Sequence, residues 1–136
     1  MSREISSERI EEAVAAALRV RENAYAPYSR FHVGAAIIDG DGGIHVGCNV
    51  ENASYGLTNC AERAAVAAAT SGGRRDIAVC VVVTQTSPPA APCGACRQVL
   101  SECNPEMRIL TTNPAREDTW YSLADLLPSA FGPASF

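Results

Sequence analysis

Residues 60–83 read CAERAAVAAATSGGRRDIAVCVVV, and this stretch decides the fold. The alanine-rich segment 60–71 predicts a helix, which Gly72 and Gly73 should end. Residues 78–83 form a continuous apolar run rich in β-branched residues, which is typical of a strand buried on both faces. A helix followed by such a central strand indicates an α/β fold in which helices cover a sheet.

The segments on either side of this stretch extend the same pattern. Apolar residues recur at helical spacing from residue 6 to residue 23, and two β-branched runs flank the glycine-rich DGDGG turn and predict a hairpin in which Val46 faces inward. Two further helices and one further strand are expected after residue 83. We expect helices at 6–23, 60–71, 93–103 and 122–127, and strands at 33–38, 44–50, 78–83 and 108–112. This order predicts a three-layer α/β/α sandwich with a mixed sheet.

Length and charge restrict the class of protein. The chain has 136 residues, of which 47% are hydrophobic, so we expect residues 1–136 to form one domain with a real core. The net charge is −4, which argues against a nucleic-acid partner. All eleven basic residues are Arg, so a Lys Schiff base and a P-loop Lys are both excluded.

The chain has six cysteines. It has no apolar segment long enough to span a membrane, and its N-terminus is charged where a signal peptide would be apolar. We therefore expect a cytoplasmic protein whose thiols stay reduced and serve a metal or catalysis. Cys48, Cys80 and Cys103 lie inside expected helices and strands and are interpreted as small buried residues. His32 and His45 lack metal-ligand spacing and are interpreted as surface residues.

Two cysteine motifs open expected helices. Cys60-Ala61-Glu62 begins one, and Pro92-Cys93-Gly94-Ala95-Cys96 begins the other. Three thiolates at two helix starts would leave a fourth metal position open, which is typical of a catalytic zinc site. A Cys-x-x-Cys pair also occurs in structural zinc sites and redox pairs, and Glu62 with Asn59 also fits a capping box.

The combination of the two motifs favours catalysis, because Cys-x-Glu followed by Pro-Cys-x-x-Cys is a signature of zinc-dependent nucleobase deaminases. The chain resembles the small tetrameric cytidine deaminases over nearly its whole length. The segments that carry the likeness are Tyr28-Ser29-Arg30-Phe31, Val33-Gly34-Ala35-Ala36, GCNVENASYG (47–56), Cys60-Ala61-Glu62-Arg63, PCGACRQ (92–98), Leu126-Leu127-Pro128 and Phe131-Gly132-Pro133. The resemblance implies a five-stranded sheet, a homotetramer with shared active sites, and a role in pyrimidine salvage.

The resemblance also assigns roles to individual residues. It implies one Zn²⁺ per chain, bound by Cys60, Cys93 and Cys96, with Glu62 as the proton carrier. Arg63 would offset the excess negative charge of three thiolates. The substrate-binding residues would be Phe31 against the base, Ala61 through its backbone on the base carbonyl, Asn49 and Glu51 on the ribose, and Tyr55 and Phe131, the last from a neighbouring subunit.

The expected reaction is the hydrolytic deamination of cytidine and deoxycytidine to uridine and deoxyuridine, with release of ammonia. The alternatives are a deaminase of a related cytosine nucleoside such as blasticidin S, a deaminase that edits nucleic acid, and a non-catalytic zinc protein. The segment Trp120-Tyr121 matches no motif, so its contribution stays open.

Overall fold

The computed structural model describes residues 4–136, and these build a five-stranded sheet with strand order β2-β1-β3-β4-β5. The strands are β1 (Gly34–Asp39), β2 (Ile44–Cys48), β3 (Ile77–Val83), β4 (Arg108–Thr112) and β5 (Thr119–Ser122). The helices are α1 (Ser7–Arg21), α2 (Ala61–Ser71), α3 (Gly94–Cys103) and α4 (Leu123–Leu126), with short 3₁₀ turns at Tyr55–Leu57 and Pro133–Ser135.

The sheet is mixed, as expected. β1 pairs antiparallel with β2 and with β3, and β5 pairs antiparallel with β4. The pair β3–β4 is parallel, which requires a crossover connection, and α3 provides it. The central position of β3 confirms the prediction drawn from its continuous apolar run.

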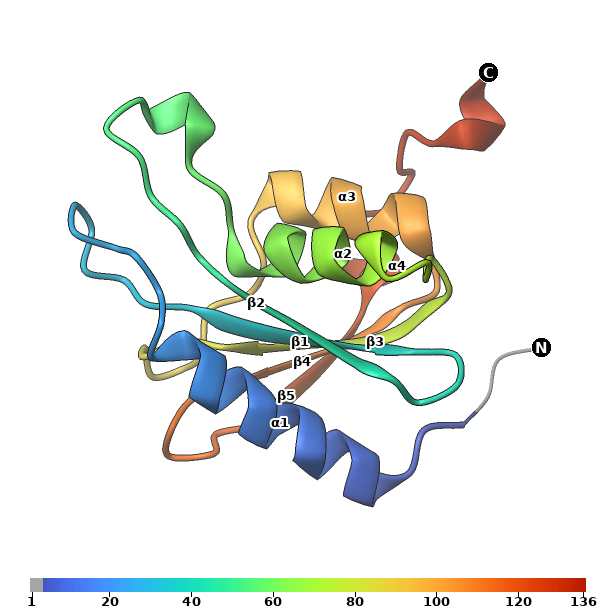
Figure 1. Cartoon of the computed structure of the whole chain (residues 1–136). Coiled ribbons are helices and arrows are strands. Elements are labelled where there is room, and N and C mark those ends of the chain that lie inside the picture. Colours follow the sequence, from blue (N-terminus) through green and yellow to red (C-terminus); the bar gives the residue numbers. More distant parts are fainter. Residues whose placement is uncertain (1–3) are drawn as a thin grey trace.

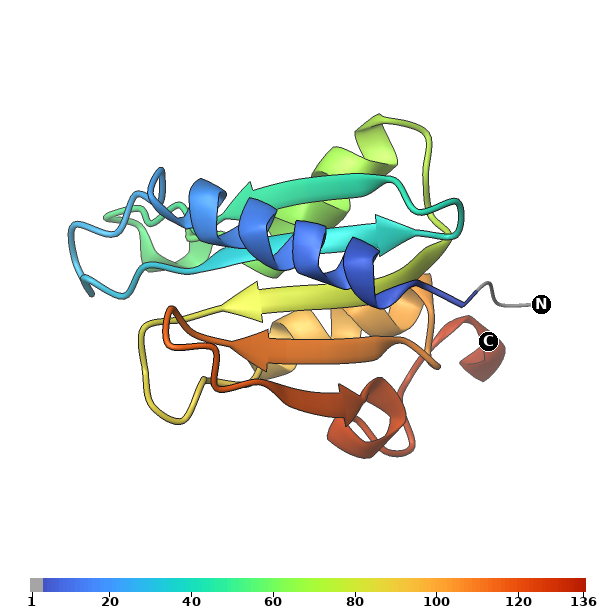
Figure 2. The same cartoon turned by 90° about the horizontal axis from the view of Figure 1, so that it is seen from below.

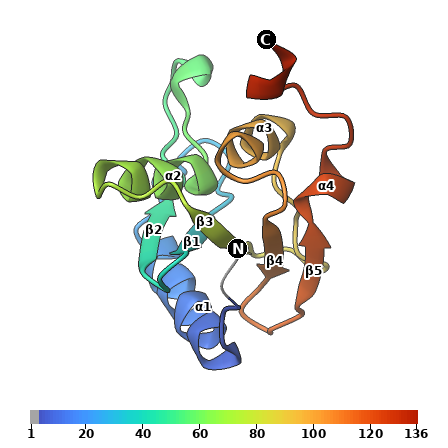
Figure 3. The same cartoon turned by 90° about the vertical axis from the view of Figure 1, so that its right-hand side faces the viewer.

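Helices cover both faces of the sheet, which confirms the three-layer architecture. α1 packs on one face, while α2 and α3 pack on the other (Figures 1 and 3). Along β3, Val81 belongs to the hydrophobic cluster beneath α1, and Val82 belongs to the cluster beneath α2 and α3. Seen from below, α1 crosses the β1 side of the sheet and leaves β4 and β5 without a helix on that face (Figure 2). Within residues 4–136, none of the helices is long and apolar enough to cross a membrane.

Two details of the sheet differ from expectation. Val46 is 38% exposed, because it lies on edge strand β2 opposite Ala36, on the face that α1 covers only in part. The face of β2 toward α2 is occupied by Gly47, where a Cβ would lie 2.4 Å from the Ala65 backbone nitrogen. The second difference is β5, which places Trp120-Tyr121 in a strand that the sequence pattern did not locate.

The topology brings two helix starts together. α2 and α3 both begin at the end of the sheet where β3 ends (Figure 1). Cys60 is the N-cap of α2 and Cys93 is the N-cap of α3. The two cysteine motifs are therefore neighbours at one edge of the molecule, although a helix, a strand and a loop separate them in sequence.

Candidate metal centre and its pocket

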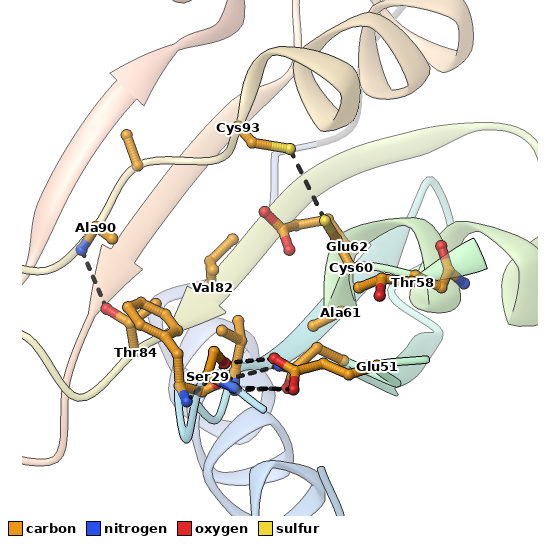
Figure 4. Close-up of a pocket in the computed structure, with 15 residues that line it drawn as sticks. Ser29, Glu51, Thr58, Cys60, Ala61, Glu62, Val82, Thr84, Ala90 and Cys93 are labelled. Atoms are coloured by element: carbon orange, nitrogen blue, oxygen red, sulfur yellow. Dashed lines mark hydrogen bonds between the residues drawn. The ribbon is translucent and has the colours of Figure 1, made fainter. Parts of the chain in front are cut away.

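The side chains of Cys60, Cys93 and Cys96 converge. Their sulfur atoms all lie within 4.8 Å of one another, and the Cys60 and Cys93 sulfurs are 3.8 Å apart (Figure 4). Neither N-cap thiol makes a capping hydrogen bond to its helix, so both sulfurs are available to a ligand. Three convergent thiols with room for a fourth ligand fit Zn²⁺, which prefers sulfur and forms tetrahedral sites. This agrees with the expected ligand set.

The acidity of the thiols fits a metal-binding cluster. Hydrogen bonding from Cys96 is the main cause that lowers the pKa of Cys60 to about 5, and burial partly opposes it. The same hydrogen bond, together with burial, raises the pKa of Cys96. The sharing of one proton between these sulfurs favours a thiolate in the cluster, and a thiolate is the form of cysteine that binds metals.

Glu62 lies in the first turn of α2 and is only 5% exposed. Burial is the main cause that raises its pKa to about 7, and the negative charge at Cys60 adds to the effect. A carboxyl group that titrates near neutral pH can both accept and return a proton. The capping-box interpretation of Glu62 fails, because the N-cap of α2 is Cys60 and not Asn59.

Arg63 contacts the sulfur cluster. Its Nη2 donates to the Cys60 sulfur at 3.3 Å and to the Thr58 carbonyl at 3.5 Å. Its Nε is buried and has no hydrogen-bond partner among residues 4–136. The Arg63 guanidinium is thus held against the thiols instead of projecting into solvent, and the hydrogen bond to Cys60 is the main cause that raises its pKa.

A cavity of about 280 Å³ opens beside the cluster, a volume near the lower end for small-molecule sites. It is lined by Ser29, Phe31, Val33, Asn49, Glu51, Thr58, Asn59, Cys60, Ala61, Glu62, Val82, Thr84, Ala90, Ala91 and Cys93. Of the substrate-binding residues expected from the sequence, Phe31, Asn49, Glu51 and Ala61 are therefore in the wall. Figure 4 shows Glu62 on the sulfur side and Glu51 on the opposite side.

Two expected substrate-binding residues lie outside this cavity. Tyr55 is 79% exposed and packs edge-on against Tyr28 in an adjoining hollow. Phe131 is 61% exposed, contacts Phe136, and has its carbonyl held by the Gln98 side chain at 2.8 Å. Within one chain, neither ring reaches the cavity.

Several lining residues were missed by sequence reasoning. Thr84 directly follows β3 and accepts a hydrogen bond from the Ala90 backbone at 3.0 Å, which fixes the loop that leads to Cys93. The place of Thr84 after a buried central strand was the available signal, because loops at strand ends often carry sites. Ala90 and Ala91 carry no chemical signal of their own. Ser29 was visible only as part of the Tyr28-Ser29-Arg30-Phe31 motif.

The histidine and cysteine residues outside the site were also given positions from the sequence. His45 is only partly exposed, because its Nε2 pairs with buried Asp39 at 2.9 Å at the far end of the sheet from the cavity. Cys80 is fully buried, as expected, whereas Cys48 and Cys103 are only partly buried.

The chain is similar in sequence and structure to known zinc-binding deaminases. The family model "Cytidine and deoxycytidylate deaminase zinc-binding region" matches residues 7–112. A cytidine deaminase of Halalkalibacterium halodurans is 50% identical over 116 residues, which are 85% of this chain and 88% of that protein. The crystal structure of a Burkholderia pseudomallei cytidine deaminase has 48% identity and a TM-score of 0.87, covering 93% of this chain and 100% of that one.

A Mycobacterium tuberculosis cytidine deaminase structure is similar at 44% identity and a TM-score of 0.76, covering 90% of this chain and 97% of that one. The family match spans both cysteine motifs and includes Glu62. Family, relatives and fold agree with the thiol cluster, which is placed to hold a metal ion. This chain therefore belongs to the cytidine deaminase family, in its small bacterial, zinc-binding form.

Proposed function

We propose that this chain hydrolyses the 4-amino group of cytidine and deoxycytidine, giving uridine or deoxyuridine and ammonia. The observation that carries the proposal is the convergence of three thiols, two of which line one small cavity, with a buried carboxyl group in the wall of the same cavity whose pKa is about 7. Relatives named cytidine deaminase support the choice of substrate. Pyrimidine salvage is the process that such a reaction would serve.

Cys60, Cys93 and Cys96 would hold one Zn²⁺, which when bound supplies Lewis-acid activation of water. Glu62 carries the protons. It accepts one proton from the water that adds to ring C4 and delivers it to ring N3. It then accepts the second proton, from the new C4 hydroxyl, and passes it to the amine nitrogen, which leaves as ammonia while C4 becomes a carbonyl. One carboxyl group can do this because its raised pKa makes both protonation states accessible at neutral pH.

Arg63 would limit the negative charge at the three sulfurs. Its hydrogen bond to the Cys60 sulfur draws electron density from that ligand. Because three thiolates give Zn²⁺ a net formal charge of −1, a cation in contact with one sulfur favours the ionisation of water at the site.

The opposite wall would bind the nucleoside. Phe31 would contact the base, the Ala61 backbone would bind the base carbonyl, and Asn49 and Glu51 would bind the ribose. The Asn49 amide already donates to the Phe31 carbonyl at 2.7 Å and accepts from the Val33 N–H at 2.9 Å. It retains one N–H and one lone pair for a ligand, and its other bonds fix the segment that carries Phe31.

We propose further that residues 1–136 act as one deaminase domain, assembled into a homotetramer with shared active sites. Tyr55 and Phe131 would then complete a neighbour's cavity, which is supported by their exposure and their position outside their own cavity. The six free cysteines support a reducing, cytoplasmic location.

The test is ammonia release and loss of cytosine absorbance after the purified, zinc-loaded protein is mixed with cytidine or deoxycytidine. We expect turnover of both nucleosides and none of a cytosine-containing oligonucleotide, because the chain has a net charge of −4. Turnover of the oligonucleotide but not of the nucleosides would contradict the proposal.

A further inference from the structure

Glu51 is held by its neighbours before any ligand arrives. Its Oε1 accepts the backbone N–H groups of Tyr28 at 3.0 Å and Ser29 at 3.2 Å. Its Oε2 accepts the hydroxyl of Ser29, so one serine binds both oxygens of the carboxylate (Figure 4). Both residues line the cavity.

The Ser29 hydroxyl has its own orientation fixed. It donates to Glu51, and its oxygen accepts the Phe31 backbone N–H at 3.0 Å. A serine hydroxyl has one proton, and here that proton is committed to the carboxylate. Two successive hydrogen bonds, from the Phe31 N–H to the Ser29 oxygen and from the Ser29 hydroxyl to Glu51 Oε2, therefore connect the segment that carries Phe31 to the expected sugar-binding carboxylate.

The turn that carries Ser29 is also fixed. Arg30 has a φ of 60°, a left-handed conformation that costs energy for a residue with a side chain. Its N–H donates to the Ala26 carbonyl at 3.0 Å, and its carbonyl accepts the Gln85 side chain at 3.3 Å. These bonds hold the turn, so the Ser29 hydroxyl keeps its place although it is exposed.

Counting acceptor sites shows what this arrangement leaves open. An ionised carboxylate has about four lone-pair directions. Two on Oε1 and one on Oε2 are taken by Tyr28 and Ser29. The hydrogen bond from the Ser29 hydroxyl is also the main cause that lowers the pKa of Glu51. At neutral pH this carboxylate is therefore ionised, and it can accept hydrogen bonds but not donate them.

We propose that Ser29 is a positioning residue that leaves Glu51 one free acceptor direction, on Oε2, and that this direction selects a single hydroxyl of the nucleoside sugar. The inference rests on the proposed function. Because deoxycytidine is also an expected substrate, the 2′-hydroxyl is dispensable. Of the two hydroxyls that remain, the 5′-hydroxyl rotates about an exocyclic C–C bond, whereas the 3′-hydroxyl is fixed to the sugar ring, so the single acceptor direction is assigned to the 3′-hydroxyl. Without the Ser29 hydroxyl, the two backbone N–H groups hold Oε1 alone, so the carboxylate can turn about Oε1 and the lone pairs of Oε2 no longer point in one direction.

The experiment compares Ser29→Ala with Ser29→Thr, which keeps a hydroxyl. Ser87→Ala is the matched control, because Ser87 also donates to a carboxylate, that of Glu117 at 2.8 Å, but lies outside the cavity. Each protein is assayed with cytidine, 2′-deoxycytidine and 3′-deoxycytidine, and far-UV circular dichroism checks the fold.

For Ser29→Ala we expect KM for cytidine and 2′-deoxycytidine to rise about tenfold with kcat changed less than about twofold, because a hydrogen bond to a charged group is misaligned. For 3′-deoxycytidine, the wild type and Ser29→Ala should agree within about twofold in kcat/KM, since the bond is absent in both. Ser29→Thr and Ser87→Ala should resemble the wild type on all three substrates.

Equal losses on all three nucleosides would overturn the proposal, because Ser29 would then act on the base segment as a whole. Unchanged kinetics of Ser29→Ala, or a loss confined to kcat, would overturn it too. Failure of the proposed function would be seen separately, as a zinc-loaded wild type that turns over none of the nucleosides. Calorimetric titration with uridine and 3′-deoxyuridine would then decide, because the proposal requires that Ser29→Ala weaken only uridine binding.

Discussion

The Arg63 guanidinium donates a hydrogen bond to the Cys60 sulfur at 3.3 Å, although the two residues lie in the same helix start and Arg63 could project into solvent. The contact places a positive charge on one of three convergent thiols. It also leaves Arg63 Nε buried without a partner in the described part of the chain, so a favourable interaction at the sulfurs must offset that cost.

Replacing Arg63 with Gln should lower kcat by about ten- to a hundredfold while zinc is retained, since a group that contacts a ligand tunes the metal without binding it. Zinc content and steady-state kinetics, measured together, check this. Arg75→Gln is the matched control, because among residues 4–136 the Arg75 side chain hydrogen-bonds only the exposed Thr70 hydroxyl, at 3.3 Å. An Arg63→Gln enzyme with wild-type kinetics would show that the contact has no role in turnover.

Cytidine monophosphate should be a poorer substrate than cytidine by about tenfold or more in kcat/KM, because the Glu51 carboxylate in the cavity wall repels a phosphate. Raising the salt concentration should narrow the difference by screening the repulsion. Glu51→Gln should narrow it as well. Equal rates on nucleoside and nucleotide would remove Glu51 from the sugar end of the site.

Asp39 lies far from the cavity and should matter for stability alone. Its buried carboxylate accepts His45 Nε2 at 2.9 Å and the backbone N–H groups of Asp41 and Gly43 at 2.9 and 3.0 Å. Burial alone would raise the pKa of Asp39, but these hydrogen bonds outweigh it and the pKa is lowered. Asp39→Asn should therefore reduce the free energy of unfolding by about 1–3 kcal/mol at neutral pH.

The pH dependence of this effect has a definite sign. A carboxyl whose pKa is lower in the folded state stabilises the fold above its unfolded pKa, and that contribution is lost as the pH falls through the folded pKa. The stability difference between wild type and Asp39→Asn should thus shrink in acid. Urea unfolding at several pH values measures it, with kcat as the control; a difference that grows in acid would contradict the assignment.

Much of the fold followed from the sequence where burial is strong. Strand β3 was predicted because both of its faces are covered, which requires an unbroken apolar run. β5 was missed because it is a four-residue edge strand with mostly exposed residues, so no apolar alternation marks it. Val46 is more exposed than predicted because it lies on edge strand β2, where α1 covers its face only in part, and the sequence does not show how far a helix extends over an edge strand.

In the candidate site, the chemically reactive residues could be predicted from the sequence, but their surroundings could not. Cys60, Glu62, Cys93 and Cys96 carry chemistry that their spacing reveals, and the thiols do converge. Their environment could not be predicted, because the burial of Glu62 depends on the packing of whole layers. The Ala90 segment lines the cavity through backbone position alone, and no side-chain pattern encodes that.

Sharing of active sites between subunits can be tested by mixing. Phe131 is exposed and lies outside its own cavity, so in a tetramer its ring is available to a neighbour. If it acts there, mixed tetramers of Glu62→Gln and Phe131→Ala chains should be more active than either parent, because some sites combine an intact Glu62 with an intact Phe131. A mixture of Glu62→Gln chains with chains that carry both Glu62→Gln and Phe131→Ala should show no increase in activity, because no site then has an intact Glu62. No gain in verified mixed tetramers, or a fully active monomer, would exclude shared sites.

The central claim is that Glu62 moves protons beside a zinc ion held by the three thiols. The most direct measurement is the rate of cytidine deamination by Glu62→Gln and by wild type at equal, independently measured zinc content. We predict one zinc per chain in both proteins and a fall in kcat of about 10²–10⁴-fold in the variant, since the amide cannot carry a proton. Near-normal turnover by fully zinc-loaded Glu62→Gln would contradict the mechanism.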